Sequence, residues 1–154
     1  TRRLGIPTGE KLNRTIVEFY YKDDALQDPL VSEEHIITFG WASQNELDEI
    51  TSLALRINDF LAGYFSAIKI QLVDFKIEFG RLYKNDEVYV VLADEISPDS
   101  CRLWDSETKQ KMDKDVYREN SGYLLDGYNE VAKRMGLLTQ NGTSKNKKPT
   151  LVKG

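Results

Sequence analysis

The sequence contains very few of the side chains that bind transition metals or form disulfides. Its 154 residues include one cysteine, Cys101, and one histidine, His35. A single cysteine cannot form an internal disulfide, which favours a reducing compartment, and we expect a cytoplasmic protein. A structural zinc site is not expected, because it draws on several cysteine or histidine ligands. A catalytic thiol–imidazole pair is not expected either, since nothing in the pattern orients the two side chains together.

Long apolar runs and glycine-rich phosphate loops are also lacking. A transmembrane helix needs about 20 mostly apolar residues, and because no such run occurs, no membrane partner is predicted. Without a P-loop, a protein that uses ATP would take part of its phosphate grip from outside these residues. The net charge is -4 and the pI is about 5.1. Nucleic-acid binders are more often basic, so nucleic acid is not a predicted partner.

The composition is that of a folded domain. Hydrophobic residues make up 40% of the chain and charged residues 30%, which suffices for one globular domain with its own core. Residues 15–21 are β-branched and aromatic, and predict a strand. Residues 32–38 predict a short helix. Residues 123–135 predict a final helix that Gly136 can cap.

The clearest predicted helix spans residues 43–65. Ser43 and Glu46 have the spacing of a capping box at its start. Apolar residues follow at three- and four-residue spacing and form one stripe, namely Leu47, Ile50, Ala54, Ile57, Leu61 and Tyr64. A stripe of this kind packs against a core.

Residues 68–79 and 87–93 are predicted to be the strands of a β-hairpin. Each strand is rich in β-branched and aromatic residues, and the Asn85-Asp86 pair between them predicts a turn. Antiparallel pairing would then bring the region of Glu78 opposite the region of Ala93 and Asp94.

The alternation in residues 68–79 changes phase near Leu72, which indicates a bulge or a break. After that point Asp74, Lys76 and Glu78 share one parity, so we expect them to project together. Residues 96–118 read as a mostly irregular polar loop, and long loops in compact domains are often functional.

Carboxylates are concentrated around the predicted hairpin. They are Asp74, Glu78, Asp94, Glu95 and Asp99. Clustered carboxylates repel one another unless a cation neutralises them, and oxygen ligands suit Mg²⁺. The alternative is an acidic surface that is simply solvated. Lys76, between two of these carboxylates, favours the functional interpretation because it could pair with a transferring phosphate.

The predicted loop also carries basic residues. Arg102 lies between Asp99 and Asp105, and the planar arginine fork suits phosphate and carboxylate groups. The alternative is an ion pair that stabilises the loop. Lys114 and Arg118 leave the same two interpretations open.

Four segments resemble successive signature segments of the SAICAR synthetase family. They are FYYKDDALQDP, LVDFKIEFGR, VLADEISPDSCRLWD and KMDKDVYR, in the family's order and spacing. The likeness covers residues 1–138, which we expect to form the substrate- and metal-binding lobe. Residues 139–154 match nothing in the family and read as a polar, basic, mobile tail.

The resemblance implies a ligase that uses ATP, L-aspartate and carboxyaminoimidazole ribonucleotide (CAIR) to make SAICAR, ADP and phosphate. It implies an α+β fold, the larger lobe of a two-lobed, kinase-like ATP grip in which a hairpin sheet packs with helices, and a homodimer. The first lobe is absent from this chain, which we expect to be inactive alone. A kinase-like phosphotransferase and a non-catalytic nucleotide-binding module are the alternatives.

The resemblance also implies roles for residues near the hairpin. Glu78 and Asp94 would hold the Mg²⁺ that bridges the ATP phosphates, and so would contact the nucleotide. Asp74 and Lys76 would lie at the reacting groups as catalytic residues.

The remaining implied roles concern the substrates. Arg102 would bind the phosphate of the ribonucleotide, with Asp99 near the same substrate and Arg118 as a further substrate-binding residue. Lys22 and Asp28, from the KDDALQDP segment, would line the cleft, the lysine toward the nucleotide and the aspartate toward the substrate.

Overall fold

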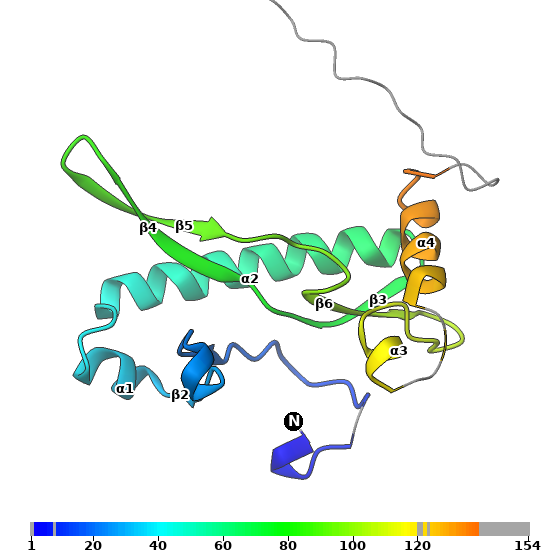
Figure 1. Cartoon of the computed structure of the whole chain (residues 1–154), viewed down its shortest axis with the longest axis horizontal. Helices are drawn as coiled ribbons and strands as arrows, with labels where there is room; N and C mark the ends of the chain where they lie inside the picture. The colour runs from blue at the N-terminus through cyan, green and yellow to red at the C-terminus, as the bar shows by residue number, and fades with distance from the viewer. Residues whose placement is uncertain (1, 8, 120–121, 123, 139–154) are drawn as a thin grey trace, which may run out of the picture. The chain divides into compact units, whose positions relative to one another are not determined.

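The computed structural model describes residues 2–7, 9–119, 122 and 124–138, so the predicted tail lies outside the described residues. The fold is α+β with small antiparallel sheets, as predicted (Figure 1). The residues group into two compact units. Unit 1 takes the residues up to Leu61 together with Ile77–Glu95, and unit 2 takes Ala62–Lys76 and the residues from Ile96 onward. No helix in the described part is long and apolar enough to cross a membrane.

Unit 1 contains a hairpin, two α-helices and a short two-stranded ribbon. Its elements are η1 (Arg2–Leu4), β1 (Phe19–Tyr20), η2 (Asp24–Leu26), β2 (Leu30–Val31), α1 (Glu33–Thr38), α2 (Gln44–Ala67, up to Leu61), β4 (Glu78–Lys84) and β5 (Glu87–Ala93). Leu47 of α2 and Ile36 of α1 are buried apolar residues of this unit.

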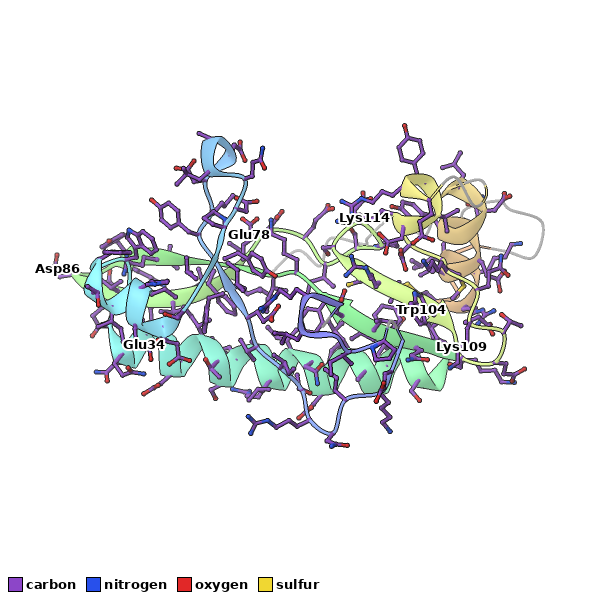
Figure 2. All side chains as sticks on the ribbon, turned by 90° about the horizontal axis from the view of Figure 1, so that it is seen from below. Glu34, Glu78, Asp86, Trp104, Lys109 and Lys114 are labelled. Carbon is purple, nitrogen blue, oxygen red and sulfur yellow. The ribbon has the colours of Figure 1, made fainter. Side chains whose placement is uncertain are left out.

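The predicted hairpin is confirmed as β4 paired with β5. Its register sets Glu78 opposite Ala93, as expected from the sequence. Asn85 and Asp86 form the turn with φ values of +52° and +62°, the left-handed pair that suits a tight hairpin turn. Figure 2 labels Asp86 at the tip of the hairpin and Glu78 at the opposite end of β4, where the strand begins.

The strand predicted over residues 15–21 is mostly wrong. Only Phe19 and Tyr20 form a strand, β1, and they pair with Val31 and Leu30 of β2. The ribbon stays this short because α1 begins immediately after β2, with Ser32 as its N-cap. Upstream residues therefore have no paired strand, whatever their β propensity.

The helix starts predicted near Ser32 and Ser43 are both confirmed. The Ser32 hydroxyl caps α1 by accepting a hydrogen bond from the His35 amide. At α2 the Ser43 amide donates to Glu46 Oε2 at 2.8 Å, and the Glu46 amide donates to Ser43 Oγ at 3.3 Å. The same Glu46 carboxylate accepts from Arg81 of β4, through Nε at 2.6 Å and Nη2 at 3.0 Å. One carboxylate thus ties the start of α2 to the hairpin.

Unit 2 is a second antiparallel pair with two helices. Its elements are the end of α2, β3 (Ile70–Phe75), β6 (Cys101–Asp105), α3 (Asp115–Arg118) and α4 (Leu124–Arg134). Its buried apolar side chains include Phe65, Ile70, Leu103, Met112, Val116 and Val131. Gly136 ends α4 with φ +73°, and the amides of Gly136 and Leu137 donate back to Lys133 and Ala132, as predicted for the cap.

One expectation about this region is wrong and another is incomplete. Residues 68–79 do not form one strand, because β3 ends at Phe75 and β4 begins at Glu78, each in a different two-stranded sheet. Residues 96–118 are mostly irregular, as predicted, but the prediction missed β6 at residues 101–105 and α3 at residues 115–118. The alternating apolar pattern of this strand is short, because only Cys101 and Leu103 are buried in the core, with exposures of 2% and 0%. The phase change near Leu72 is confirmed as a register shift between Leu72 and Asp74.

Gly127 of α4 packs directly against the backbone of Met112. A methyl group added at Gly127 would lie 3.0 Å from the Met112 Cα and 3.1 Å from its carbonyl carbon. We predict that Gly127→Ala lowers the free energy of unfolding by about 1–2 kcal/mol, because overpacking outweighs the gain in helix propensity. Gly63→Ala in α2, where nothing lies within 4 Å, should instead raise it by about 0.5–1 kcal/mol. Urea denaturation of both variants checks this, and equal stabilisation would refute it.

The Glu46–Arg81 pair predicts a pH-dependent contribution to stability. Hydrogen bonds from Arg81 lower the pKa of Glu46 from 4.5 to about 2. A carboxylate with a depressed folded-state pKa stabilises the fold above its unfolded pKa, and this stabilisation disappears as the pH falls toward 2. Glu46→Gln should therefore lower stability by about 1 kcal/mol at pH 7, and by progressively less below pH 4.5. Denaturant titrations at several pH values measure the difference, and a difference independent of pH would contradict the assignment.

Candidate functional site

Four of the predicted site residues lie at one end of the β3–β6 pair in unit 2. Asp74 is the register partner of Arg102, and beyond it Phe75 pairs with Cys101. The Lys76 amide then donates to the Ser100 carbonyl at 2.7 Å, so the pairing continues past the end of β3. Asp99 directly precedes Ser100. The structure therefore brings Asp74, Lys76, Asp99 and Arg102 to the same strand end.

The guanidinium of Arg102 is held by two carboxylates. Its Nη1 donates to Asp74 Oδ2 at 2.7 Å, and its Nε donates to Asp115 Oδ2 at 2.7 Å. Hydrogen bonding to Asp115, with a further contribution from Asp74, raises the pKa of Arg102 above its ordinary value. Arg118, the other predicted arginine, lies with its Nη1 3.5 Å from Asp115 Oδ1. Asp115 is therefore a partner shared by both arginines.

A buried carboxylate that sequence reasoning missed supports this arrangement. Asp113 has 0% exposure, accepts from the Leu103 amide at 2.7 Å and accepts from the Asp115 amide at 2.8 Å. Burial raises the pKa of Asp113 above its ordinary value, and the two backbone hydrogen bonds only partly oppose this shift. Asp113 thus fastens the start of α3 to β6. The only sequence signal is an aspartate two residues before Asp115, ahead of a short helix.

Asp99 is held in a tight turn that leads into β6. The Ser100 amide donates to the Ser97 carbonyl at 3.0 Å, and the Asp99 amide donates to Ser97 Oγ at 3.2 Å. The Asp99 carboxylate accepts a hydrogen bond from the Tyr128 hydroxyl of α4. Backbone hydrogen bonds therefore fix the turn at Asp99, and the bond from Tyr128 fixes the Asp99 side chain.

The other predicted residues lie in unit 1 around the start of β4. Lys22 forms an ion pair with Glu78, whose side chain is only 16% exposed. The bond to Glu78, together with the charges of Asp94 and Asp28, raises the pKa of Lys22. Asp94 follows Ala93, the register partner of Glu78, and has a φ of +67°, so the chain turns sharply there. One lysine thus faces three carboxylates.

Asp28 also shapes the loop that carries Lys22. Its Oδ1 accepts from the Asp23 amide at 2.9 Å, while its own amide donates to the Asp23 carbonyl at 3.1 Å. Gln27 and Asp28 have φ values of +59° and +48°, a conformation that aspartate tolerates better than most residues. The polar pattern of this segment therefore builds a closed loop beside Lys22.

The carboxylates of unit 1 suit a metal ion that also takes ligands from a bound nucleotide. Within the described residues, no group of three or more His, Cys, Asp or Glu side chains is arranged to hold a metal ion alone. Mg²⁺ commonly takes one or two carboxylates and completes its shell with water and substrate phosphates. Glu78 and Asp94 supply two hard oxygen donors at one hairpin end, so the donor chemistry is suitable.

Unit 1 also contains a cavity of about 470 Å³. The stacked rings of Tyr21 and Trp41 line it, with ring centroids 4.0 Å apart, and so do Phe79 and Arg81 of β4. Because side chains alternate along a strand, Phe79 and Arg81 lie on the opposite face of β4 from Glu78. Lys22 is the one predicted residue in the lining. This cavity therefore does not coincide with the carboxylate group.

The predicted residues thus form two groups. Unit 1 holds Lys22, Asp28, Glu78 and Asp94, and unit 2 holds Asp74, Lys76, Asp99, Arg102 and Arg118. The expectation that Asp74, Lys76 and Glu78 project together from one strand is wrong, because the strand breaks between Phe75 and Glu78.

The cysteine is placed as a structural residue. Cys101 is 2% exposed, and burial raises the pKa of its thiol, which disfavours the nucleophilic thiolate. His35 accepts a hydrogen bond from the Ser32 amide at Nδ1 and stacks on Phe39. Neither residue belongs to the two groups above.

Comparisons with known proteins identify the family. A family model described as SAICAR synthetase matches residues 1–135. The phosphoribosylaminoimidazole-succinocarboxamide synthase of Sinorhizobium medicae (strain WSM419) is 61% identical over 153 residues, which cover 99% of this chain and 60% of that protein. The Ehrlichia chaffeensis enzyme of the same name has a solved structure that matches with a TM-score of 0.85 and 47% identity, over 90% of this chain and 59% of that chain.

A second solved structure, described as SAICAR synthetase (Type-2) in complex with ADP, matches with a TM-score of 0.82 and 43% identity. It covers 94% of this chain and 58% of that chain. The chain thus spans about 60% of the length of the relatives it matches. Because a family model covers most of its residues and the Sinorhizobium medicae protein is 61% identical to it, the chain belongs to the SAICAR synthetase family.

Proposed function

We propose that this chain is the metal- and ribonucleotide-binding part of a ligase that joins L-aspartate to CAIR at the expense of ATP. The observation that carries the proposal is the identity of 61% to a phosphoribosylaminoimidazole-succinocarboxamide synthase along nearly the whole chain. The convergence of Asp74, Lys76, Asp99 and Arg102 at one strand end supports it. The two-lobed architecture, the homodimer and the cytoplasmic location belong to the same proposal.

The chemistry of amide formation explains what such a site must do. A carboxylate is a poor acyl donor, so a CAIR carboxylate oxygen first attacks the γ-phosphorus of ATP and the bond to ADP breaks. The amine of aspartate then attacks the acyl carbon of the resulting acyl phosphate, phosphate leaves, and the amine loses a proton. Both steps depend on positioning and on neutralising negative charge, more than on a protein nucleophile. The buried Cys101 is consistent with that requirement.

The two groups of residues would divide this work. In unit 1, Glu78 and Asp94 would hold Mg²⁺, which neutralises phosphate charge when bound. Lys22, paired with Glu78 here, would turn to the nucleotide phosphates. In unit 2, Arg102 and Arg118 would bind the phosphate ester of the ribonucleotide.

Three acidic residues and one lysine complete the proposed roles. Asp74 and Lys76 would lie at the reacting carboxylate and the transferring phosphoryl group, and Asp99 and Asp28 would contact the substrates. The reason is electrostatic: a lysine beside carboxylates can neutralise an incoming phosphoryl group, while the aspartates orient amine and hydroxyl donors.

The first test is the reaction itself. The full-length protein should convert CAIR, L-aspartate and ATP to SAICAR with equal release of ADP and phosphate, measured by chromatography and a phosphate assay. The 154 residues alone should be inactive, since they offer no P-loop and span only part of their relatives. Transfer of phosphate to a hydroxyl acceptor without any need for aspartate would contradict the proposal and favour a kinase-like phosphotransferase.

The second test addresses the metal. Glu78→Gln and Asp94→Asn in the full-length protein should each lower kcat/KM by about 100-fold or more, because a metal ligand is lost. Binding of Mn²⁺ with a non-hydrolysable ATP analogue, followed by electron paramagnetic resonance, should weaken in parallel. Glu87→Gln, at the turn end of β5, removes the same charge from the same hairpin and should change neither measurement more than about twofold. Normal metal binding in both site variants would refute the assignment.

A further inference from the structure

Asp115 is a carboxylate with no role in the predicted site, yet it contacts both predicted substrate arginines. Its Oδ2 accepts from Arg102 Nε at 2.7 Å, and its Oδ1 lies 3.5 Å from Arg118 Nη1. The side chain of Asp115 is 13% exposed, against 41% for Arg102 and 57% for Arg118. The carboxylate therefore lies beneath the arginines, and their exposed portions lie toward solvent.

The other carboxylate on Arg102 differs in exposure. Asp74 accepts from Arg102 Nη1 at the same distance of 2.7 Å, but its side chain is 56% exposed. An exposed partner can be exchanged for a ligand at small cost, because water already competes for the bond. A nearly buried partner is lost at greater cost, because the remaining charge has less water to replace it. Asp115 is thus the fixed contact of the guanidinium, and Asp74 is the exchangeable one.

The position of Asp115 is itself fixed. Its amide donates to buried Asp113, and Asp113 in turn accepts from the amide of Leu103, the neighbour of Arg102 in β6. A closed chain of hydrogen bonds therefore runs from β6 through Asp113 and Asp115 back to Arg102. Burial works against ionisation of Asp115, but hydrogen bonding to Arg102 and the charges of the surrounding cations lower its pKa overall.

We propose that Asp115 is a positioning residue that holds Arg102 in the orientation in which it receives the phosphate ester of the ribonucleotide. The inference rests on the proposed function, since it assumes that Arg102 binds that group. The long side chain of arginine has considerable conformational freedom. When Asp115 restricts that freedom in the free protein, less of it is lost on binding, and the affinity for the anion rises.

The test is a double-mutant cycle in the full-length protein. Asp115→Asn keeps the shape and removes the charge, and it should raise the KM for CAIR about tenfold, with kcat and the KM for ATP little changed. Arg102→Ala should raise the same KM by at least as much. In the Arg102→Ala background, Asp115→Asn should have a much smaller further effect, because only the longer contact with Arg118, at 3.5 Å, remains.

A matched control and a direct binding measurement separate this role from a structural one. Glu107→Gln removes one charge from an exposed ion pair of unit 2, with Lys69 at 3.1 Å, and should leave the KM for CAIR unchanged. Binding of ribose 5-phosphate, measured by calorimetry, should weaken in Asp115→Asn at a temperature where thermal denaturation shows the variant fully folded. Asp115→Glu should recover part of the affinity.

Each outcome has one meaning. An unchanged KM in Asp115→Asn, or an equal rise with and without Arg102, would overturn the positioning role and leave the ligase proposal intact. Failure of the full-length protein to make SAICAR would overturn the proposed function. In that case the ribose 5-phosphate titration still decides for or against Asp115, because it requires only anion binding at Arg102.

Discussion

Charge compensation around Arg102 is the interaction on which the organisation of unit 2 depends. The side chain reaches an exposed carboxylate on β3 and a nearly buried one on α3. The second of these is fixed by Asp113, a buried carboxylate whose two backbone bonds connect β6 with the start of α3. A strand, a loop and a short helix are thereby joined by three acidic side chains that would repel one another without the arginine. The same arrangement leaves part of a guanidinium exposed, so the group that stabilises the fold is also suited to bind an anion.

Unit 1 uses charge differently. Glu78 and Asp94 lie at one end of a hairpin, next to a loop that closes on itself through Asp23 and Asp28. The charges of these carboxylates act on Lys22, which pairs with Glu78. The carboxylates at this hairpin end share Lys22, whereas in unit 2 Arg102 and Arg118 contact Asp74 and Asp115. This difference fits the proposed division between a cation-binding group and an anion-binding group.

Much of this could be predicted from the sequence, because local patterns carry it. The Ser43–Glu46 cap, the turn at Asn85 and the phase change at Leu72 each have a short-range physical cause, and each is confirmed. The helix stripe is confirmed at Leu47 and Leu61, which are buried, but is wrong at Tyr64, which is 38% exposed while its neighbour Phe65 is buried. Strand β6 was missed because its partner β3 lies more than twenty residues away and only two of its residues alternate into the core. Asp113 and Asp115 were missed for a related reason: their roles arise from contacts with β6, which neighbouring residues do not encode. Most of the site residues are candidates from their type and spacing, whereas their roles, together with Lys22 and Asp28, are implied by the family resemblance.

The register shift between Leu72 and Asp74 decides which face of the β3–β6 sheet Asp74 occupies. Register partners in an antiparallel pair place their side chains on the same face. Leu72 faces Leu103 and Asp74 faces Arg102, so Val73 is the extra residue of a bulge. If the ladder ran on without the bulge, Val73 would pair with Arg102 and Asp74 would face buried Cys101. The bulge therefore moves Asp74 to the face of the sheet opposite the core. With one unpaired residue, β3 can be apolar along most of its length and charged at its end.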